Sequence, residues 1–213
     1  MNEILDQISR AVIEGDPDNM GTLTELALSK GLTPEDILNK GLMLGMDYVG
    51  NEFREAKMFV PDVIFAARAM QASMDVLTPL LVEAGAKRAG KVVMGTVQGD
   101  LHDIGKNLVC IMMEGAGFEV IDLGKDIAPE AFVEAVKEEK PDIVGMSAML
   151  TTTMPAMDRT IEALEEAGLR DSVKIMVGGV TVTSDFAQQI GADGYASNAP
   201  AAADMAKQIV GIQ

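Results

Sequence analysis

The chain has 213 residues, a formal net charge of −16 and 48% hydrophobic residues. This size and composition are typical of a folded protein that buries its own core, and the acidic charge argues against binding to nucleic acids or anionic membranes, which need a basic surface. Its single cysteine excludes an intramolecular disulfide. Because neither a signal peptide nor an apolar stretch of the roughly 20 residues that span a bilayer is recognisable, we expect a cytoplasmic protein.

The first part of the chain is expected to be helical, because its apolar residues recur at helical spacing. The expected helices cover residues 2–14, 19–29, 33–56 and a stretch from Pro61 through Leu81. The third has a typical start signal, since Thr33 is followed by Pro34 and by an acid three residues after the threonine. Four helices with short loops predict a bundle, which we assign to residues 1–88.

Residues 84–90 are small, basic and glycine-containing, and they are the expected linker between two domains. Beyond them, short apolar runs alternate with helical stretches. Strands are expected at 92–97, 120–123, 143–148, 174–177 and 194–196, and helices at 104–115, 129–139, 155–167, 184–190 and 201–210. This alternation predicts a doubly wound, Rossmann-like α/β domain with a parallel sheet over residues 89–213, and five strands favour the flavodoxin-like order.

The only histidine, His102, lies in the segment Gly99–Asn107, directly after the first expected strand. Ligands of open α/β sheets bind at such strand ends. A zinc site needs three or four protein ligands, usually His or Cys, and the chain has one of each. A metal at His102 must therefore arrive with most of its coordination filled, as in a haem or a corrinoid. Asp100 is placed to accept the other imidazole N–H, and Gly105 allows close approach.

A simpler interpretation of the same segment is a strand-to-helix turn with a solvent-exposed histidine. In that case Asp103 serves as the N-cap of the following helix.

The segment Gly99–Asn107 resembles the D-x-H-x-x-G cobalamin-binding motif of methionine synthase. The same motif occurs in the small corrinoid proteins of methanol, methylamine and O-demethylase methyltransferase systems, and the resemblance extends over nearly the whole chain. It implies a helical-bundle cap followed by a five-stranded, flavodoxin-like cobalamin-binding domain. It also implies that His102 replaces the benzimidazole of cobalamin or a related cobamide as the lower axial ligand of cobalt, in the base-off/His-on form.

Other segments match the family as well. Ser147 and Thr151 match a Ser and a Thr that contact the buried nucleotide tail, and Thr153 aligns with a serine that extends the His–Asp pair in methionine synthase. The alternative is that Thr151 to Thr153 cap the helix that begins near Pro155, and both interpretations could hold at once. The cofactor-binding residues implied by the resemblance are Gly99, Leu101, Asp103, Ile104, Gly105, Ser147, Met149, Leu150, Thr151, Gly178, Gly179, Asn198 and Ala199.

In the helical part, residues 51–61 align without gaps to the stretch of methionine synthase that shields the upper face of cobalt. Two apolar residues provide that shield, and they correspond to Phe53 and Val60. An apolar cover protects methyl–cobalt chemistry from water. The competing interpretation is that both residues belong to the core of the bundle.

The function that the resemblance implies is that of a corrinoid protein, not catalytic alone, that carries a methyl group on cobalt. Its partners would be a substrate-specific methyltransferase barrel, a second methyltransferase acting on tetrahydrofolate or coenzyme M, and a reductive activase. The donor would be a methylamine, methanol, a quaternary amine or a methoxylated aromatic compound.

Three alternatives stay open at this point. One is a cobalamin-dependent sensor, against which the lack of a helix-turn-helix or basic segment argues. Another is an excised cobalamin module of a methionine synthase. The third is the small subunit of a cobalamin-dependent mutase, which gives no reason for the helical cap.

Overall fold

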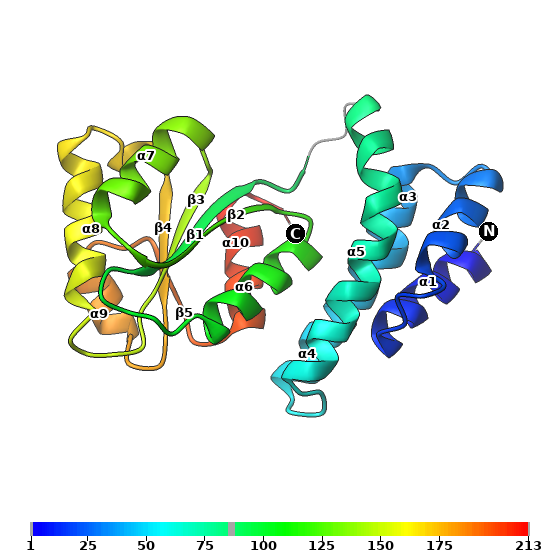
Figure 1. Cartoon of the computed structure of the whole chain (residues 1–213), viewed down its shortest axis with the longest axis horizontal. Coiled ribbons are helices and arrows are strands. Elements are labelled where there is room, and N and C mark those ends of the chain that lie inside the picture. The colour runs from blue at the N-terminus through cyan, green and yellow to red at the C-terminus, as the bar shows by residue number, and fades with distance from the viewer. Residues whose placement is uncertain (1, 85–87, 213) are drawn as a thin grey trace. The chain divides into compact units, whose positions relative to one another are not determined.

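The computed structural model describes residues 2–84 and 88–212, so residues 85–87 of the expected linker lie outside it (Figure 1). Two compact units are present, one made of the N-terminal helices and the other of the sheet and the helices that cover it. The expected fold class, a helical bundle followed by a five-stranded α/β domain, is confirmed.

The helical unit contains the four helical stretches that the periodicity predicts. They are α1 (Asn2–Glu14), α2 (Met20–Ser29), the continuous run of α3 (Pro34–Ile37), a π-helical turn (Leu38–Leu42) and α4 (Met43–Arg54), and finally α5 (Val60–Glu83). The hydroxyl of Thr33 accepts a hydrogen bond from the Asp36 backbone N–H at 3.1 Å, which confirms the predicted start of α3.

Close packing of α1 against α4 depends on a glycine. A Cβ atom at Gly45 would lie 2.8 Å from the Val12 Cβ and 2.9 Å from the Ser9 carbonyl oxygen, closer than side chains pack. Val12 is fully buried, as are Ile8 on the same helix and Val49 on α4. The small residue therefore lets the two helix backbones approach and bury this core.

The longest helix, α5, has 24 residues and contains Pro79 near its end. Proline removes one backbone donor there, yet the helix continues to Glu83. Along the described stretches of the chain, no helix combines the length and the apolar character needed to cross a membrane.

The sheet of the second unit is parallel, with the strand order β2-β1-β3-β4-β5 that the flavodoxin-like pattern predicts. Its strands are β1 (Lys91–Val97), β2 (Glu119–Ile127), β3 (Ile143–Ser147), β4 (Lys174–Gly178) and β5 (Gly194–Ala196). The connecting helices are α6 (Ile104–Gly115), α7 (Pro129–Glu139), α8 (Pro155–Glu166), α9 (Ser184–Gln189) and α10 (Ala199–Ile209), and a short 3₁₀ turn (Arg170–Ser172) precedes β4.

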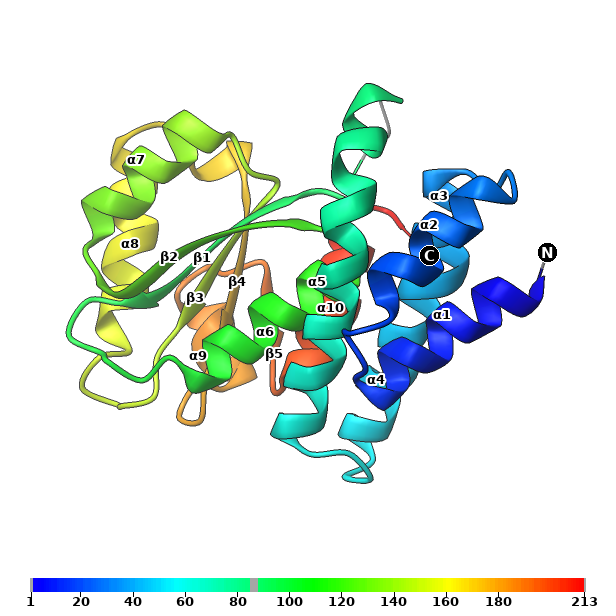
Figure 2. The ribbon, with the colours of Figure 1, turned by 45° about the vertical axis from the view of Figure 1, so that its right-hand side comes forward.

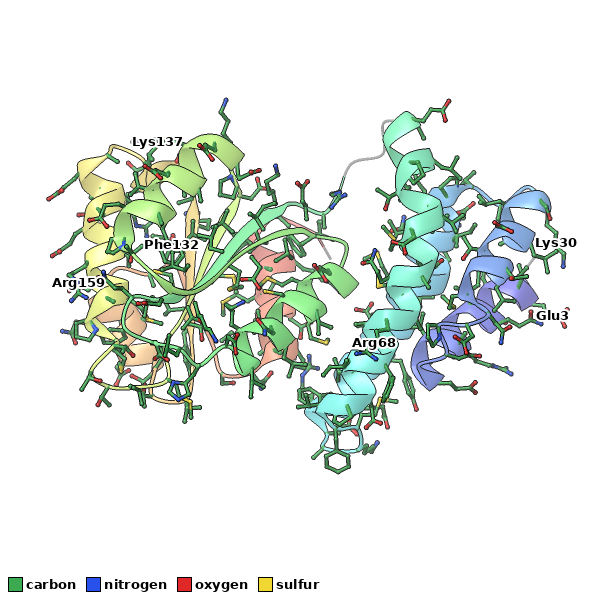
Figure 3. The ribbon with its side chains drawn as sticks, viewed as in Figure 1. Glu3, Lys30, Arg68, Phe132, Lys137 and Arg159 are labelled. Carbon is green, nitrogen blue, oxygen red and sulfur yellow. The ribbon has the colours of Figure 1, made fainter. Side chains whose placement is uncertain are left out.

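Helices cover both faces of this sheet. α7 and α8 lie on one face and α6 and α10 on the other (Figure 1), and the turned view in Figure 2 shows the same layers. On the first face, Phe132 of α7 points toward the sheet (Figure 3) and is fully buried. A Cβ atom at Gly95 of β1 would lie 2.6 Å from the Phe132 ring, so glycine at this strand position makes room for the aromatic side chain.

One strand differs from its expected length. β2 continues to Ile127 instead of ending at residue 123, and its pairing with β1 becomes irregular over this extension. Gly95 pairs with Gly124 and Val97 with Ile127, so one residue of β1 faces two residues of β2. Such an extra residue is a β-bulge. A glycine and several charges in this stretch mask the strand pattern at the level of sequence.

We expect Gly45→Ala to destabilise the helical unit by about 1–3 kcal/mol, because the added methyl group overpacks the α1–α4 contact. Gly21→Ala is the matched control, since it is also a helical glycine and its Cβ would meet no atom within 4 Å. The control should gain up to about 1 kcal/mol from helix propensity. Urea denaturation followed by circular dichroism measures both changes, and equal effects of the two substitutions would contradict this account.

Candidate functional site

The candidate site lies at the carboxyl edge of the sheet, in the loops that follow β1 and β3. β1 and β3 are neighbours in the sheet. The chain after β1 forms β2 on one side of β1, and it then crosses over to form β3 on the other side. This is the topological switch point of an open α/β sheet, where ligands bind. Register brings the two loops together, because Thr96 pairs with Ser147 at the ends of the two strands.

The carboxylate of Asp100 is the centre of the site and is fully buried. Its Oδ1 atom accepts the His102 backbone N–H at 3.0 Å and lies 2.7 Å from His102 Nδ1. Its Oδ2 atom accepts the Thr153 hydroxyl and the Met149 backbone N–H, both at 2.7 Å, and the Leu150 backbone N–H at 3.3 Å. Both oxygens are thus surrounded by donors from the β1 and β3 loops.

These contacts keep Asp100 ionised. Burial by itself raises the pKa of this carboxyl group, but the hydrogen bonds from Thr153, Met149 and His102 outweigh burial and hold its pKa well below the usual range. An ionised carboxylate is an acceptor only. Asp100 therefore favours the His102 tautomer that carries its proton on Nδ1.

The His102 side chain is half exposed, whereas its Asp100 partner has no exposed surface. Since Nδ1 faces the carboxylate, Nε2 is the ring nitrogen left to bind a ligand through its lone pair. This combination of a fixed tautomer and an accessible nitrogen is typical of a histidine prepared to bind a metal. Asp103 directly precedes α6, and its carbonyl oxygen accepts the Asn107 backbone N–H at 2.8 Å, so it stands at the N-cap position that the simpler interpretation expects. That interpretation by itself does not account for the contact between Asp100 and the His102 ring.

The structure joins Thr153 to this pair, as the predicted relay requires. Its hydroxyl lies 2.7 Å from Asp100 Oδ2 and 2.9 Å from the Leu150 carbonyl oxygen. The N-cap position of α8 is instead Met154, which forms no side-chain cap bond. The capping alternative for Thr153 is therefore wrong.

Exposed apolar side chains gather in the segments that follow the strands at this edge of the sheet. In the described part of the α/β unit, the exposed large hydrophobic residues are Leu101, Ile104, Met149, Leu150, Val180 and Ile212, with exposed fractions of 62%, 74%, 41%, 42%, 82% and 37%. All except Ile212 belong to the loops and the helix start that follow β1, β3 and β4. We call these five residues the apolar rim. An exposed apolar patch of this kind marks a binding surface.

Two hydroxyl groups near the same edge have no protein partner. The Thr181 hydroxyl is buried without a hydrogen bond, and the half-buried Ser147 hydroxyl is not engaged by any residue that the structure describes. A buried hydroxyl without a partner is costly. Both groups are available to a polar ligand. Thr181 was not predicted, and Thr151, the other hydroxyl residue predicted beside Ser147, is exposed.

The glycine pair after β4 has a reason within the protein. A Cβ atom at Gly179 would lie 1.9 Å from the Ala148 carbonyl oxygen, and one at Gly178 would lie 2.9 Å from the Ala196 carbonyl oxygen. Gly179 also has a φ of +134°. Both glycines are therefore required by the close approach of neighbouring backbone segments, and this requirement does not depend on a bound ligand.

The remaining predicted residues lie elsewhere. Asn198 caps α10, because its Oδ1 atom accepts the Ala201 backbone N–H at 2.9 Å, and Ala199 is buried in the same turn. In the helical unit, Phe53 lies on α4 and Val60 begins α5, and both are half-buried. Neither belongs to the fully buried core of the bundle.

Two supporting residues escaped the sequence analysis. Thr96 is fully buried, and its hydroxyl lies 3.3 Å from the His102 carbonyl oxygen. Lys106 is 2% exposed, and its ammonium group donates to Asn107 Oδ1 at 2.7 Å and to the Asp122 carboxylate of β2 at 2.6 Å. The signal for Lys106 was its place within the histidine segment, but only its burial identifies a structural role.

Comparisons with known proteins identify the family of the chain. Two profiles of the family described as B12 binding domain match residues 90–204 and residues 4–78. A corrinoid protein of Desulfitobacterium hafniense is 43% identical and a dimethylamine corrinoid protein of Methanosarcina acetivorans 44% identical, each over 98% of both chains. A chain in the methanol:cobalamin methyltransferase complex of Methanosarcina barkeri is 33% identical, with a TM-score of 0.87 over 98% of this chain and 80% of that one.

We expect Thr153→Val to lower the free energy of unfolding by about 1.5–3 kcal/mol at pH 7, because it removes a hydrogen bond to a buried charge. Since the pKa of Asp100 is lowered in the folded state, its stabilisation is present above the unfolded-state pKa of about 3.9 and is lost as the pH falls through the folded-state pKa. Because the unfolded-state pKa is common to both proteins, the difference between the variant and the wild type should persist through about pH 3.9 and shrink only as the pH falls through the lowered folded-state pKa of Asp100.

Urea denaturation at pH 7 and at pH 4 measures the loss, which should be the same at both values. Thr153→Ser, which keeps the hydroxyl, is the control and should stay close to the wild type at each pH. An equal loss in the serine and valine variants would mean that Thr153 acts by packing and not through its hydroxyl.

Proposed function

Because the chain belongs to the B12-binding family of corrinoid proteins, we propose that it binds cobalamin or a related cobamide at His102 and carries a methyl group between two methyltransferases. The single observation that carries this proposal is the arrangement of His102, whose Nδ1 atom is held by a buried carboxylate while its ring is half exposed.

The residues present fit a corrinoid. A Cβ atom at Gly105 would meet no protein atom within 4 Å, so nothing in the protein itself requires glycine at this exposed helical position. A large planar group on His102 gives the glycine a role, because a bare backbone permits its close approach. The apolar rim suits the face of such a macrocycle, and the Ser147 and Thr181 hydroxyls suit a polar tail.

The chemistry that the cofactor supplies when bound is reversible methylation at cobalt. The protein fixes the axial nitrogen, since Asp100 holds the Nδ1 proton and leaves the Nε2 lone pair for the metal. Thr153 and the Met149 backbone N–H keep Asp100 in place. Phe53 and Val60, neither of them fully buried, supply the apolar cover for the opposite face.

The relatives support an amine or methanol pathway for the methyl group, because those with high coverage are named dimethylamine and trimethylamine corrinoid proteins. We propose that one partner is a substrate-specific methyltransferase, a barrel that takes the methyl group from its donor, and that an acceptor methyltransferase and a reductive activase are the others, all in the cytoplasm. Similarity over nearly the full length of these relatives favours a carrier over a sensor or a methionine synthase module.

The central prediction is that the protein binds one cobamide with the benzimidazole displaced and His102 on cobalt. The chain has one histidine, so labelling with ¹⁵N-histidine changes one imidazole only. Electron paramagnetic resonance of the Co(II) form should show a nitrogen coupling that changes with the label and disappears in His102→Ala. A nitrogen coupling that does not change with the label would exclude His102 as the axial ligand.

We further expect Gly105→Ala to affect stability and binding in opposite directions. The apoprotein should be as stable as the wild type or up to about 1 kcal/mol more stable, because alanine has the higher helix propensity. Cobamide binding should weaken at least tenfold, since the methyl group occupies the space needed by the macrocycle. Denaturation of the apoprotein and titration with the cobamide separate the two effects, and unchanged binding would refute the role of Gly105.

A further inference from the structure

An aspartate that the motif does not include occupies an unusual place beside it. Asp126 lies in the bulged part of β2 and has a φ of +58°. Few residues other than glycine adopt this left-handed conformation, and aspartate is among those that tolerate it. Bulges near functional sites redirect side chains away from the regular path of the strand. The irregular pairing of Gly95 and Val97 with β2 thus determines where Asp126 points.

Asp126 makes two hydrogen bonds to the peptide that carries the site. Its Oδ1 atom accepts the Gly99 backbone N–H at 2.7 Å, and its own backbone N–H donates to the Asp100 carbonyl oxygen at 3.1 Å. The two bonds hold the N–H group of Gly99 and the carbonyl group of Asp100, which flank the Gly99–Asp100 peptide bond on its two sides. Gly99 has a φ of +85°, so this peptide turns sharply as the chain leaves β1.

The Asp126 contacts complement those that Asp100 receives from the other direction. The Asp100 side chain is held by Thr153, Met149 and Leu150 in the loop after β3. Its backbone is held by Asp126 from β2, on the opposite side of β1 in the sheet. Because the β3 loop holds its side chain and β2 holds its backbone, Asp100 has a fixed position from which its carboxylate orients the His102 ring.

Two further contacts tie the same part of β2 to the histidine segment. Asp122 pairs with the buried Lys106 ammonium, and the Lys125 ammonium lies 4.0 Å from the Asp103 carboxylate. These contacts anchor the start of α6, whereas Asp126 alone reaches the Gly99–Asp100 peptide. The backbone N–H of Asp126 bonds Asp100 whatever side chain is present, so the part that depends on aspartate is the bond from the Gly99 N–H to Oδ1.

We propose that Asp126 is a positioning residue for the axial histidine, acting through the Gly99–Asp100 peptide and the Asp100 carboxylate. This inference rests on the proposed function of His102 as the ligand of cobalt. Asp126 touches neither the metal nor His102, and its contribution is to reduce the freedom of the peptide from which Asp100 projects. Without the Asp126 side chain, the His102 ring samples orientations in which Nε2 does not point toward the metal.

The test uses the full-length protein and cobinamide, a corrinoid without the nucleotide tail, so that binding reports on the axial bond. Asp126→Gly removes the side-chain acceptor and suits a φ of +58°, so the variant is expected to fold. Asp126→Asn keeps an acceptor oxygen at the same place and is the rescue control. Each substitution is made both in the wild type and in His102→Ala, which forms a double-mutant cycle.

In the wild-type background, we expect Asp126→Gly to weaken cobinamide binding about fivefold, the loss typical of one hydrogen bond. The asparagine variant should bind within about twofold of the wild type. In the His102→Ala background, Asp126→Gly should have no further effect, because the axial bond is already absent. The labelled-histidine coupling of the Co(II) form should also broaden in Asp126→Gly and not in Asp126→Asn.

Two results would overturn the inference: unchanged binding in Asp126→Gly, or an equal loss in both backgrounds, which would indicate a general structural role. Failure of the proposed function gives a different result. If His102→Ala itself binds cobinamide as well as the wild type does, His102 is not the axial ligand, whatever Asp126 does.

Discussion

A buried negative charge organises this site. Removing a carboxylate from water is costly unless donors replace the water, and Asp100 is fully buried. The donors come from the His102 backbone and ring, from two backbone N–H groups after β3 and from the Thr153 hydroxyl. The charge is therefore stable only when the loops after β1 and β3 are both in their native positions. The orientation of the histidine follows from that requirement.

The sheet order provides this arrangement. Parallel strands direct all their carboxyl ends to one edge, and the order β2-β1-β3 places the β1 loop between the two neighbouring strands. The loop after β3 supplies donors to the Asp100 side chain, and the bulged end of β2 contacts its backbone. The histidine segment is thus held from both sides, while its outer surface stays free for a ligand.

Glycines near the site serve different purposes. Gly95 makes room for Phe132, and Gly179 allows the β4 loop to approach the Ala148 carbonyl group. Both are required by the protein's own packing. A Cβ atom at Gly105, as at Gly21, would meet no atom within 4 Å, so packing within the protein does not require glycine there, and its proposed role is to admit the cofactor.

The sequence by itself determined the elements and the motif. Helical and strand periodicities are local, and they predicted the four helical stretches and the five strands, most of them to within a few residues. The strand order was favoured by the strand count and implied by the family resemblance. The pairing of the single histidine with Asp100 could also be predicted from the sequence, because the two residues are only two positions apart. Where the local signal was interrupted, as at Gly124 in the bulged β2, the expected strand ended too early.

The contacts between distant residues required the tertiary structure. The resemblance had proposed Thr153, but its hydrogen bond to Asp100, 53 residues away, is seen only in the fold, and Asp126, 27 residues from Gly99, was not predicted at all. Their contacts depend on strand register and on a bulge, which arise from packing across the sheet and leave no periodic trace in the chain. The same holds for Gly178 and Gly179, whose need for glycine comes from backbones that meet only after folding. A sequence records which residue types are present, but the distances that make them act on one another are set by the pairing of strands far apart in the chain.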